Sequence, residues 1–119
     1  TAVLILRPGS AFLKAASELS EALRSSGVRI AAVVLNMYRE DSSIDPDTGA
    51  RWEDLTRGEL GISPLIIHHD EDWETASMRG EVPLISLLEK SRANREVVRL
   101  GSMLYEMKSR RRKIRIVLE

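Results

Sequence analysis

Two short, uninterrupted apolar runs, separated by an amphipathic segment, constrain the fold of this chain more than any other feature. The first run spans residues 2–6 and the second spans residues 30–35. Continuous runs of this length are typical of strands that are buried on both faces of a parallel sheet. Between the runs, apolar residues recur at helical spacing, namely Phe12, Leu13, Ala16, Leu19, Ala22 and Leu23. The pattern therefore predicts a strand, a helix and a second parallel strand, joined by a right-handed crossover.

Residues that favour turns and caps mark the ends of these predicted elements. The first run is followed by an Arg-Pro-Gly turn, and Ser10 is the predicted N-cap of the helix. Gly27 is expected to end the helix in a left-handed conformation, and Asn36 is expected to end the second strand. Ligands of open parallel sheets bind beyond the carboxyl ends of the strands. We therefore expect ligand contacts at residues 7–10 and 36–39.

The middle of the chain is predicted to hold a loop, a short helix and a third strand. Residues 38–50 are polar and rich in turn-forming residues, which predicts an exposed loop. Apolar residues from Trp52 onward predict a short helix that ends at Gly61. Residues 62–67 are predicted to form a buried strand, interrupted early by Pro64.

The last third of the chain is predicted to be mainly helical. A helix is expected over residues 70–79, followed by a short apolar stretch over residues 83–88. Ser91 is expected to cap a long final helix whose apolar stripe contains Val97, Leu100, Met103, Leu104 and Met107. We therefore predict an α/β fold with a mainly parallel sheet flanked by helices. Residues 1–119 are expected to form a single unit, with a basic tail over residues 108–119.

Composition excludes several classes of protein and site. The balance of 43% hydrophobic and 30% charged residues is that of a folded globular protein. No apolar run approaches the roughly 20 residues that a membrane-spanning helix needs. The apolar run over residues 2–6 is too short for the hydrophobic region of a signal peptide, so we expect none here. The absence of cysteine excludes disulfides, zinc-thiolate sites and thiol nucleophiles. It fits a reducing compartment, and we expect a cytoplasmic protein.

Charge is distributed unevenly along the chain. Residues 1–89 contain 15 acidic and 8 basic residues, whereas residues 90–119 contain 10 basic and 3 acidic residues. The densest basic cluster consists of Lys108, Arg110, Arg111, Arg112, Lys113 and Arg115. This basic cluster fits contacts with nucleic-acid phosphates, or a solvated helix end where cations favour the helix dipole. Membrane binding is disfavoured because the neighbouring apolar residues, Ile114, Ile116 and Val117, are few, and they also fit a short strand.

Four motifs in the correct order resemble the ParA/MinD family of P-loop ATPases, which carry a deviant Walker A motif. In that family a strand ends in Val-Leu-Asn-x-Tyr, and residues 33–38 are similar to it. A second family pattern runs Ile-Pro-Glu-Asp, then a short helix, then Ala-Ser-x-x-Gly-x-Pro, and residues 67–83 resemble it without a gap until Pro83, which comes one residue late. The helix over residues 97–107 is similar to the last helix of the family. The resemblance covers residues 1–107 and identifies the chain with the C-terminal half of such an ATPase.

The resemblance implies a nucleotide site at the ends of two strands. In the family, an asparagine in the position of Asn36 hydrogen-bonds the edge of the adenine base. This role suits the asparagine side chain because it has both a hydrogen-bond donor and an acceptor. The other wall of the base pocket would be formed, mostly through backbone groups, by Ile67, His68, His69 and Asp70. Taken without the resemblance, Asn36 fits a simple turn and the two histidines fit a solvated loop. A metal site is a third reading of the histidines, although adjacent side chains rarely converge on one ion.

The chain departs from the family in features that matter for catalysis. No Gly-x-x-x-x-Gly-Lys-Ser/Thr motif occurs, and the switch aspartates of the family's first half are also absent. His68 replaces the family's proline. We therefore expect a part of a longer protein that binds ATP or ADP with Mg²⁺ when intact, whereas this chain alone neither hydrolyses ATP nor binds it tightly.

The expected function is the C-terminal half of an ATPase of the DNA-segregation type, which serves plasmid or chromosome partition. Its expected partners are the missing N-terminal half, a second copy in a homodimer, non-specific DNA and a partition-type protein, but not a membrane. One alternative is a non-catalytic α/β interaction module that kept the fold without ATPase activity. Another is a small nucleic-acid-binding domain whose resemblance to the ATPases is accidental. No serine, histidine and acid arrangement has a recognisable hydrolase signature.

Overall fold

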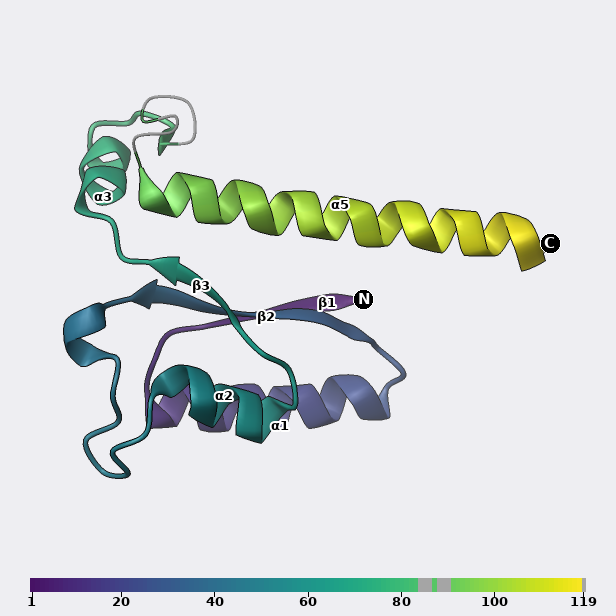
Figure 1. Cartoon of the computed structure of the whole chain (residues 1–119), viewed down its shortest axis with the longest axis horizontal. Helices are drawn as coiled ribbons and strands as arrows, with labels where there is room; N and C mark the ends of the chain where they lie inside the picture. The colour runs from purple at the N-terminus through teal and green to yellow at the C-terminus, as the bar shows by residue number, and fades with distance from the viewer. Residues whose placement is uncertain (84–86, 88–90, 119) are drawn as a thin grey trace. The chain divides into compact units, whose positions relative to one another are not determined.

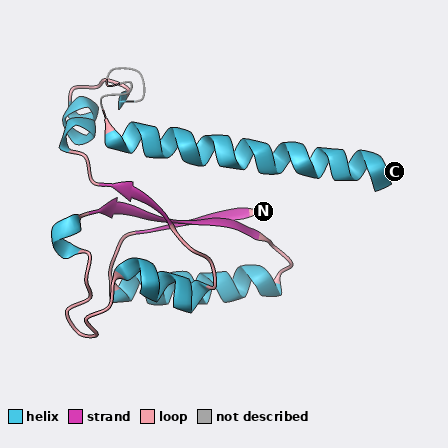
Figure 2. Ribbon diagram, viewed as in Figure 1, coloured by secondary structure: helices cyan, strands magenta, loops and turns pink. Residues whose placement is uncertain are grey.

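The computed structural model describes the backbone of residues 1–83, 87 and 91–118, and side chains as far as Lys108 (Figures 1 and 2). The chain divides into two compact units, Thr1–Glu71 and Asp72–Glu119. None of the described helices is both long enough and apolar enough to cross a membrane.

The first unit is a three-stranded parallel sheet with helices on one face. Its strands are β1 (Ala2–Leu6), β2 (Ile30–Tyr38) and β3 (Leu65–His68), in the spatial order β1-β2-β3. The helices α1 (Ser10–Ser25) and α2 (Trp52–Leu60) lie along the same face of this sheet (Figure 1). The predicted α/β fold with a parallel sheet is confirmed.

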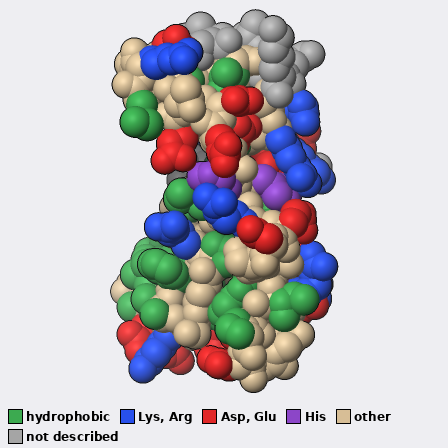
Figure 3. All heavy atoms as spheres, turned by 90° about the vertical axis from the view of Figure 1, so that its left-hand side faces the viewer, with side chains coloured by type: hydrophobic (Ala, Val, Ile, Leu, Met, Phe, Trp, Pro, Cys, Tyr) green, Lys and Arg blue, Asp and Glu red, His purple; other side chains and the backbone are tan. Residues whose placement is uncertain are grey.

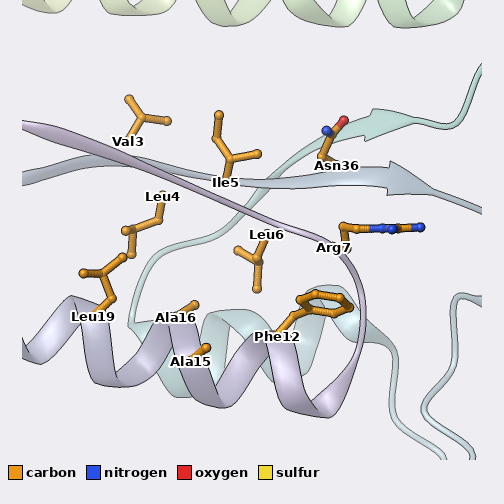
Figure 4. Close-up of a pocket in the computed structure, with 10 residues that line it drawn as sticks. All are labelled: Val3, Leu4, Ile5, Leu6, Arg7, Phe12, Ala15, Ala16, Leu19 and Asn36. Carbon is orange, nitrogen blue, oxygen red and sulfur yellow. The ribbon is translucent and has the colours of Figure 1, made fainter. Parts of the chain in front are cut away.

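The core of the first unit lies between the sheet and these two helices. Alternate side chains of β1, Leu4 and Leu6, point toward α1 (Figure 4). They join buried residues of β2, α1 and α2 in one cluster: Ala16, Val33, Leu35, Tyr38, Trp52 and Leu60. Because strand side chains alternate between faces, this cluster fixes which face of each strand meets the helices.

The start of α1 and the end of β2 differ from the prediction. Gly9, not Ser10, occupies the N-cap position, and no side chain caps the helix. The second strand extends past Asn36 to Tyr38, which is only 2% exposed. The prediction that Tyr38 begins an exposed loop is therefore wrong, because its hydroxyl is bonded to Glu53 and its ring is buried in the core.

The connection between β2 and β3 is more ordered than a plain exposed loop. It contains a short 3-10 helix over Glu40–Ser42, and Asp45 in the following turn is buried. The helix α2 ends as predicted, with Gly61 in the left-handed conformation at φ 73°. The third strand starts only after Pro64, later than predicted, since proline has no backbone N–H for the sheet and restricts the residue before it.

The second unit consists mainly of two helices, α3 (Glu71–Met78) and α5 (Arg92–Leu118). Ser91 caps α5 as predicted, because its Oγ accepts a hydrogen bond of 3.2 Å from the backbone N–H of Asn94. The backbone of α5 is helical as far as Leu118, so the alternative of a short strand near Ile116 is wrong. Most of the apolar stretch predicted over residues 83–88 lies outside the described residues.

Two glycines, one inside α2 and one directly after it, give opposite predictions for the same substitution. Gly61 has φ 73° and Gly58 has an ordinary helical conformation, while an added Cβ would meet nothing within 4 Å at either position. We expect Gly58→Ala to stabilise the first unit by up to about 1 kcal/mol, because alanine favours the helix. Gly61→Ala should destabilise it by about 1 kcal/mol or more, because the left-handed conformation strains a residue with a Cβ. Urea unfolding of both variants measures the two changes, and equal signs would contradict the assigned end of α2.

Candidate functional site

The carboxyl ends of the three strands meet at one edge of the sheet, because the strands are parallel. Asn36 lies near this end of β2, Ile67 and His68 are the last residues of β3, and His69 and Asp70 follow it directly. Figure 3 looks onto this edge, and the histidine side chains reach the surface there. The predicted base-site residues are thus placed on two neighbouring strand ends within the first unit.

The end of β2 adopts an unusual backbone conformation beside Asn36. The pairing of β2 with β3 shifts between Leu35 and Tyr38, so the ladder is irregular at this point. Met37 lies within this irregular segment and has φ 54°, the only positive φ of a non-glycine residue in the part of the chain that the structure describes. A side chain with a Cβ rarely adopts this conformation, which costs on the order of 1 kcal/mol and often occurs at functional sites.

Tyr38 holds this strand end in place through its side chain. Its buried hydroxyl donates a hydrogen bond to Glu53 Oε1, at the start of α2. The guanidinium of Arg51 donates to the same hydroxyl at 3.2 Å and to the Glu53 carboxylate at 3.3 Å. The end of β2 is thereby fixed to the first turn of α2.

Tyr38 also joins the two strand ends to each other. Its carbonyl oxygen accepts a hydrogen bond of 2.9 Å from the backbone N–H of His69. The rings of Tyr38 and His68 meet edge to face, with centroids 5.3 Å apart. The two predicted walls of the base pocket are therefore joined through Tyr38, a residue for which the sequence predicts a loop.

The electrostatics of this cluster favour an ionised Glu53 and a neutral Tyr38. Burial by itself would raise the pKa of the Glu53 carboxyl, but hydrogen bonds from Tyr38 and Arg51 and the charge of Arg51 hold that pKa below its ordinary value. Burial raises the pKa of the Tyr38 phenol, and its hydrogen bond to Glu53 raises it further. At neutral pH the cluster thus contains an ionised Glu53 carboxylate that accepts hydrogen bonds from the neutral Tyr38 hydroxyl and from the Arg51 guanidinium cation.

His68 and His69 differ in their surroundings. The His68 side chain is only 12% exposed, and its Nε2 lies 3.2 Å from Glu40 Oε1. His69 is held through its backbone N–H, which is bonded to Tyr38. Among the described residues, no three His, Asp or Glu side chains are arranged to hold a metal ion.

Sequence reasoning missed Tyr38, Arg51 and Glu53 as parts of this site. Tyr38 is the tyrosine of the Val-Leu-Asn-x-Tyr motif, so this motif could have marked it as a site residue. The positions of Arg51 and Glu53 depend on the path of residues 39–50, which no periodic pattern in the sequence specifies.

The basic cluster lies on the last turns of α5. The backbone there is helical, and Lys108 is exposed. The side chains of Arg110, Arg111, Arg112, Lys113 and Arg115 are outside the described part of the structure.

Comparison with solved structures identifies the fold. The chain is similar to the cell division ATPase MinD of Pyrococcus furiosus, with a TM-score of 0.70 and 23% identity over 89% of this chain. It is also similar to the MinD cell division protein of Aquifex aeolicus, with a TM-score of 0.72 and 18% identity over 88% of this chain. It spans only 42% and 43% of those two chains. No protein-family model matches the sequence, and no curated protein matches it. The predicted likeness to part of a MinD-type fold is confirmed.

The Glu53 cluster predicts a stability difference that depends on pH. Because the folded-state pKa of Glu53 is lowered, its stabilisation is complete above the ordinary glutamate pKa of about 4.3 and is lost as pH falls through the folded-state pKa. We expect Glu53→Gln to cost about 1 kcal/mol at pH 7 through weaker hydrogen bonds. The difference from the unsubstituted protein should shrink as the pH falls from 5 toward 2. Urea unfolding across this range measures the difference, with Glu18→Gln as the control because Glu18 is exposed on α1. A difference independent of pH would contradict the ionised cluster.

Proposed function

We propose that this chain is the base-binding half of an adenine-nucleotide-dependent ATPase of the ParA/MinD type. The observation that carries the proposal is the position of Asn36 and residues 67–70 at the carboxyl edge of a parallel sheet whose fold matches part of MinD. Ligands of open α/β sheets bind at this edge.

Asn36 is suited to read an adenine edge. Its carboxamide has a donor and an acceptor, which is the pair that the amino group and ring nitrogen of adenine require. Asn36 is partly exposed, so its side chain is accessible to a ligand. The neighbouring Met37 conformation and the Tyr38 contacts fix its backbone, which lowers the entropy that binding must remove.

The phosphates and Mg²⁺ would be held by another half of the protein. The chain contains no Walker motif, and it spans less than half of each MinD chain. We propose that the residues for ATP hydrolysis belong to a missing N-terminal half, and that the intact ATPase binds ATP or ADP with Mg²⁺ and forms a homodimer.

The basic cluster on α5 supports a role in DNA segregation. Six cations lie between Lys108 and Arg115 with no acidic residue among them. Such a cluster binds phosphates without reading base sequence. We propose that this end of the helix binds DNA non-specifically, and that a partition-type partner protein acts on the intact ATPase.

The second candidate function is a non-catalytic α/β interaction module. The observation that favours it is the absence of a phosphate-binding loop from the sequence. ATP hydrolysis by the protein encoded by the complete reading frame separates the two functions. A Walker motif together with turnover supports the ATPase, and a reading frame without this motif supports the module.

The base site predicts selective binding of adenosine. Because the chain has no phosphate cradle, the ligand to use is adenosine at millimolar concentration, and the measurement is a ¹⁵N NMR titration. We expect shift changes at residues 36–38 and 67–70, weaker changes with guanosine, and a loss of affinity of about tenfold on Asn36→Leu. Asn36→Asp keeps an acceptor but removes the donor, and should also weaken binding. Shift changes elsewhere, or equal binding by these variants, would overturn the base site.

The basic cluster predicts DNA binding that depends steeply on salt. Four to six phosphate contacts imply a log–log slope of affinity against salt of about −4 to −5. Changing Arg110, Arg111 and Arg112 together to Ala should weaken binding to all duplexes alike and flatten the slope by about 3. Fluorescence anisotropy at several salt concentrations measures both quantities. If the triple variant binds duplex DNA as well as the parent chain does, the cluster is only a solvated helix end.

A further inference from the structure

The strand β2 contains a β-bulge near its carboxyl end. Leu35 pairs with Ile66 and Tyr38 pairs with His68, so β2 advances by three residues where β3 advances by two. Met37 lies in this interval and has φ 54°, which is in the left-handed region. A bulge changes the direction of the side chains around it, and bulges are frequent beside active sites.

The bulge reverses which side chains of β2 face the helices. Leu35 belongs to the core, and Asn36 points away from α1, toward the opposite face of the sheet (Figure 4). Regular alternation would then turn Met37 into the core and Tyr38 out of it. Instead, Tyr38 is 2% exposed within the core, whereas Met37 is 39% exposed and lies outside the core cluster. The bulge thus brings an apolar side chain to the surface directly beside Asn36.

Neither feature of Met37 stabilises the fold. An exposed apolar side chain lacks the free energy that burial would provide. The left-handed conformation is unfavourable for a residue with a Cβ, and glycine or asparagine would adopt it more readily. Strain that persists in a fold is concentrated at ligand sites and switches. A contact between Met37 and a ligand accounts for both unfavourable features.

The predicted base site needs an apolar surface for the faces of an adenine ring. Asn36 and the backbone groups of residues 67–70 are hydrogen-bond donors and acceptors, which suit the edge of the ring. The His68 side chain is only 12% exposed, and it contacts the Tyr38 ring and the Glu40 carboxylate. The His68 ring is therefore engaged within the protein and leaves the faces of the base to another side chain.

Met37 has the accessible apolar surface that this site requires. Of residues 36–38 and 67–70, all of which the structure describes, Met37 alone is exposed, and the others are buried or half-buried. It directly follows Asn36, and consecutive Cα atoms are about 3.8 Å apart, so both side chains can reach one base. The thioether of methionine is flexible and polarisable, and it makes favourable contacts with aromatic rings.

We propose that the bulge presents Met37 to the ligand and that its side chain packs against one face of the adenine ring whose edge Asn36 binds. The proposal rests on the proposed function and assigns a second side chain to the same site. It gives the two residues different roles. Asn36 selects adenine through the hydrogen-bonding edge, whereas Met37 contributes affinity for any purine ring.

The direct test is ¹H–¹³C NMR of the 119-residue chain, labelled at the methyl groups of its four methionines and titrated with adenosine. The signal that disappears in Met37→Ala is that of Met37. A methyl group on the face of an aromatic ring shifts upfield, so we expect an upfield shift of the Met37 methyl. Met78 is 84% exposed and serves as the control, whose methyl should not shift. Ribose alone, which has no aromatic ring, should shift neither signal.

Matched variants measure what the contact contributes to binding. Met37→Ala should weaken the binding of adenosine and guanosine alike, by about threefold to tenfold, because the apolar contact is lost. Met37→Leu should restore most of that affinity, since leucine is apolar and similar in volume. Met78→Ala should leave adenosine binding unchanged. Circular dichroism checks that each variant folds.

A glycine variant separates binding from stability. Met37→Gly relieves the left-handed strain and should raise the urea midpoint, yet it removes the side chain and should weaken adenosine binding as Met37→Ala does. If Met37 served only the fold, a more stable variant would bind adenosine at least as well.

Three results would overturn the proposal. These are an unmoved Met37 methyl in a chain whose Asn36 amide shifts with adenosine, equal methyl shifts at Met37 and Met78, and equal adenosine binding by Met37→Ala and Met78→Ala. The first of these results leaves the base site itself intact. If adenosine shifts neither the Asn36 amide nor the Met37 methyl, the base site fails and the proposal fails with it.

Discussion

The parallel pairing of β2 with a strand on each side is the interaction on which the rest of the structure depends. It aligns β1 over five residues and pairs with β3 at Leu65, Ile66 and His68, and it brings three strand ends to one edge. It also presents Val33 and Leu35 to α1 and α2, so that sheet and helices share one core. Since strand side chains alternate in direction, a shift of one residue in β2 would turn this core toward the other face.

The edge of the sheet is connected to that core through Tyr38. Its ring belongs to the buried cluster, and its hydroxyl and carbonyl reach α2 and His69. A buried hydroxyl without a partner would be costly, and Glu53 and Arg51 remove that cost. The left-handed Met37 is held between this anchor and the regular part of β2. The backbone at Asn36 is thus held by the packing and hydrogen bonds of Tyr38, two residues further along the chain.

Local patterns allowed much of this fold to be predicted from sequence. Apolar runs and helical spacing specified β1, α1 and β2, and Gly61 specified the end of α2, because each signal lies within a few residues. Tyr38 was misassigned because its partner, Glu53, lies 15 residues away, beyond a segment with no periodic pattern. Strand ends predicted ligand contacts at residues 36–39 and charge density marked the basic cluster, whereas residues 67–70 came from the resemblance alone. The positions of these residues relative to Arg51 and Glu53 depend on the register of β2 against β3, and the spacing of residues in the sequence does not specify that register.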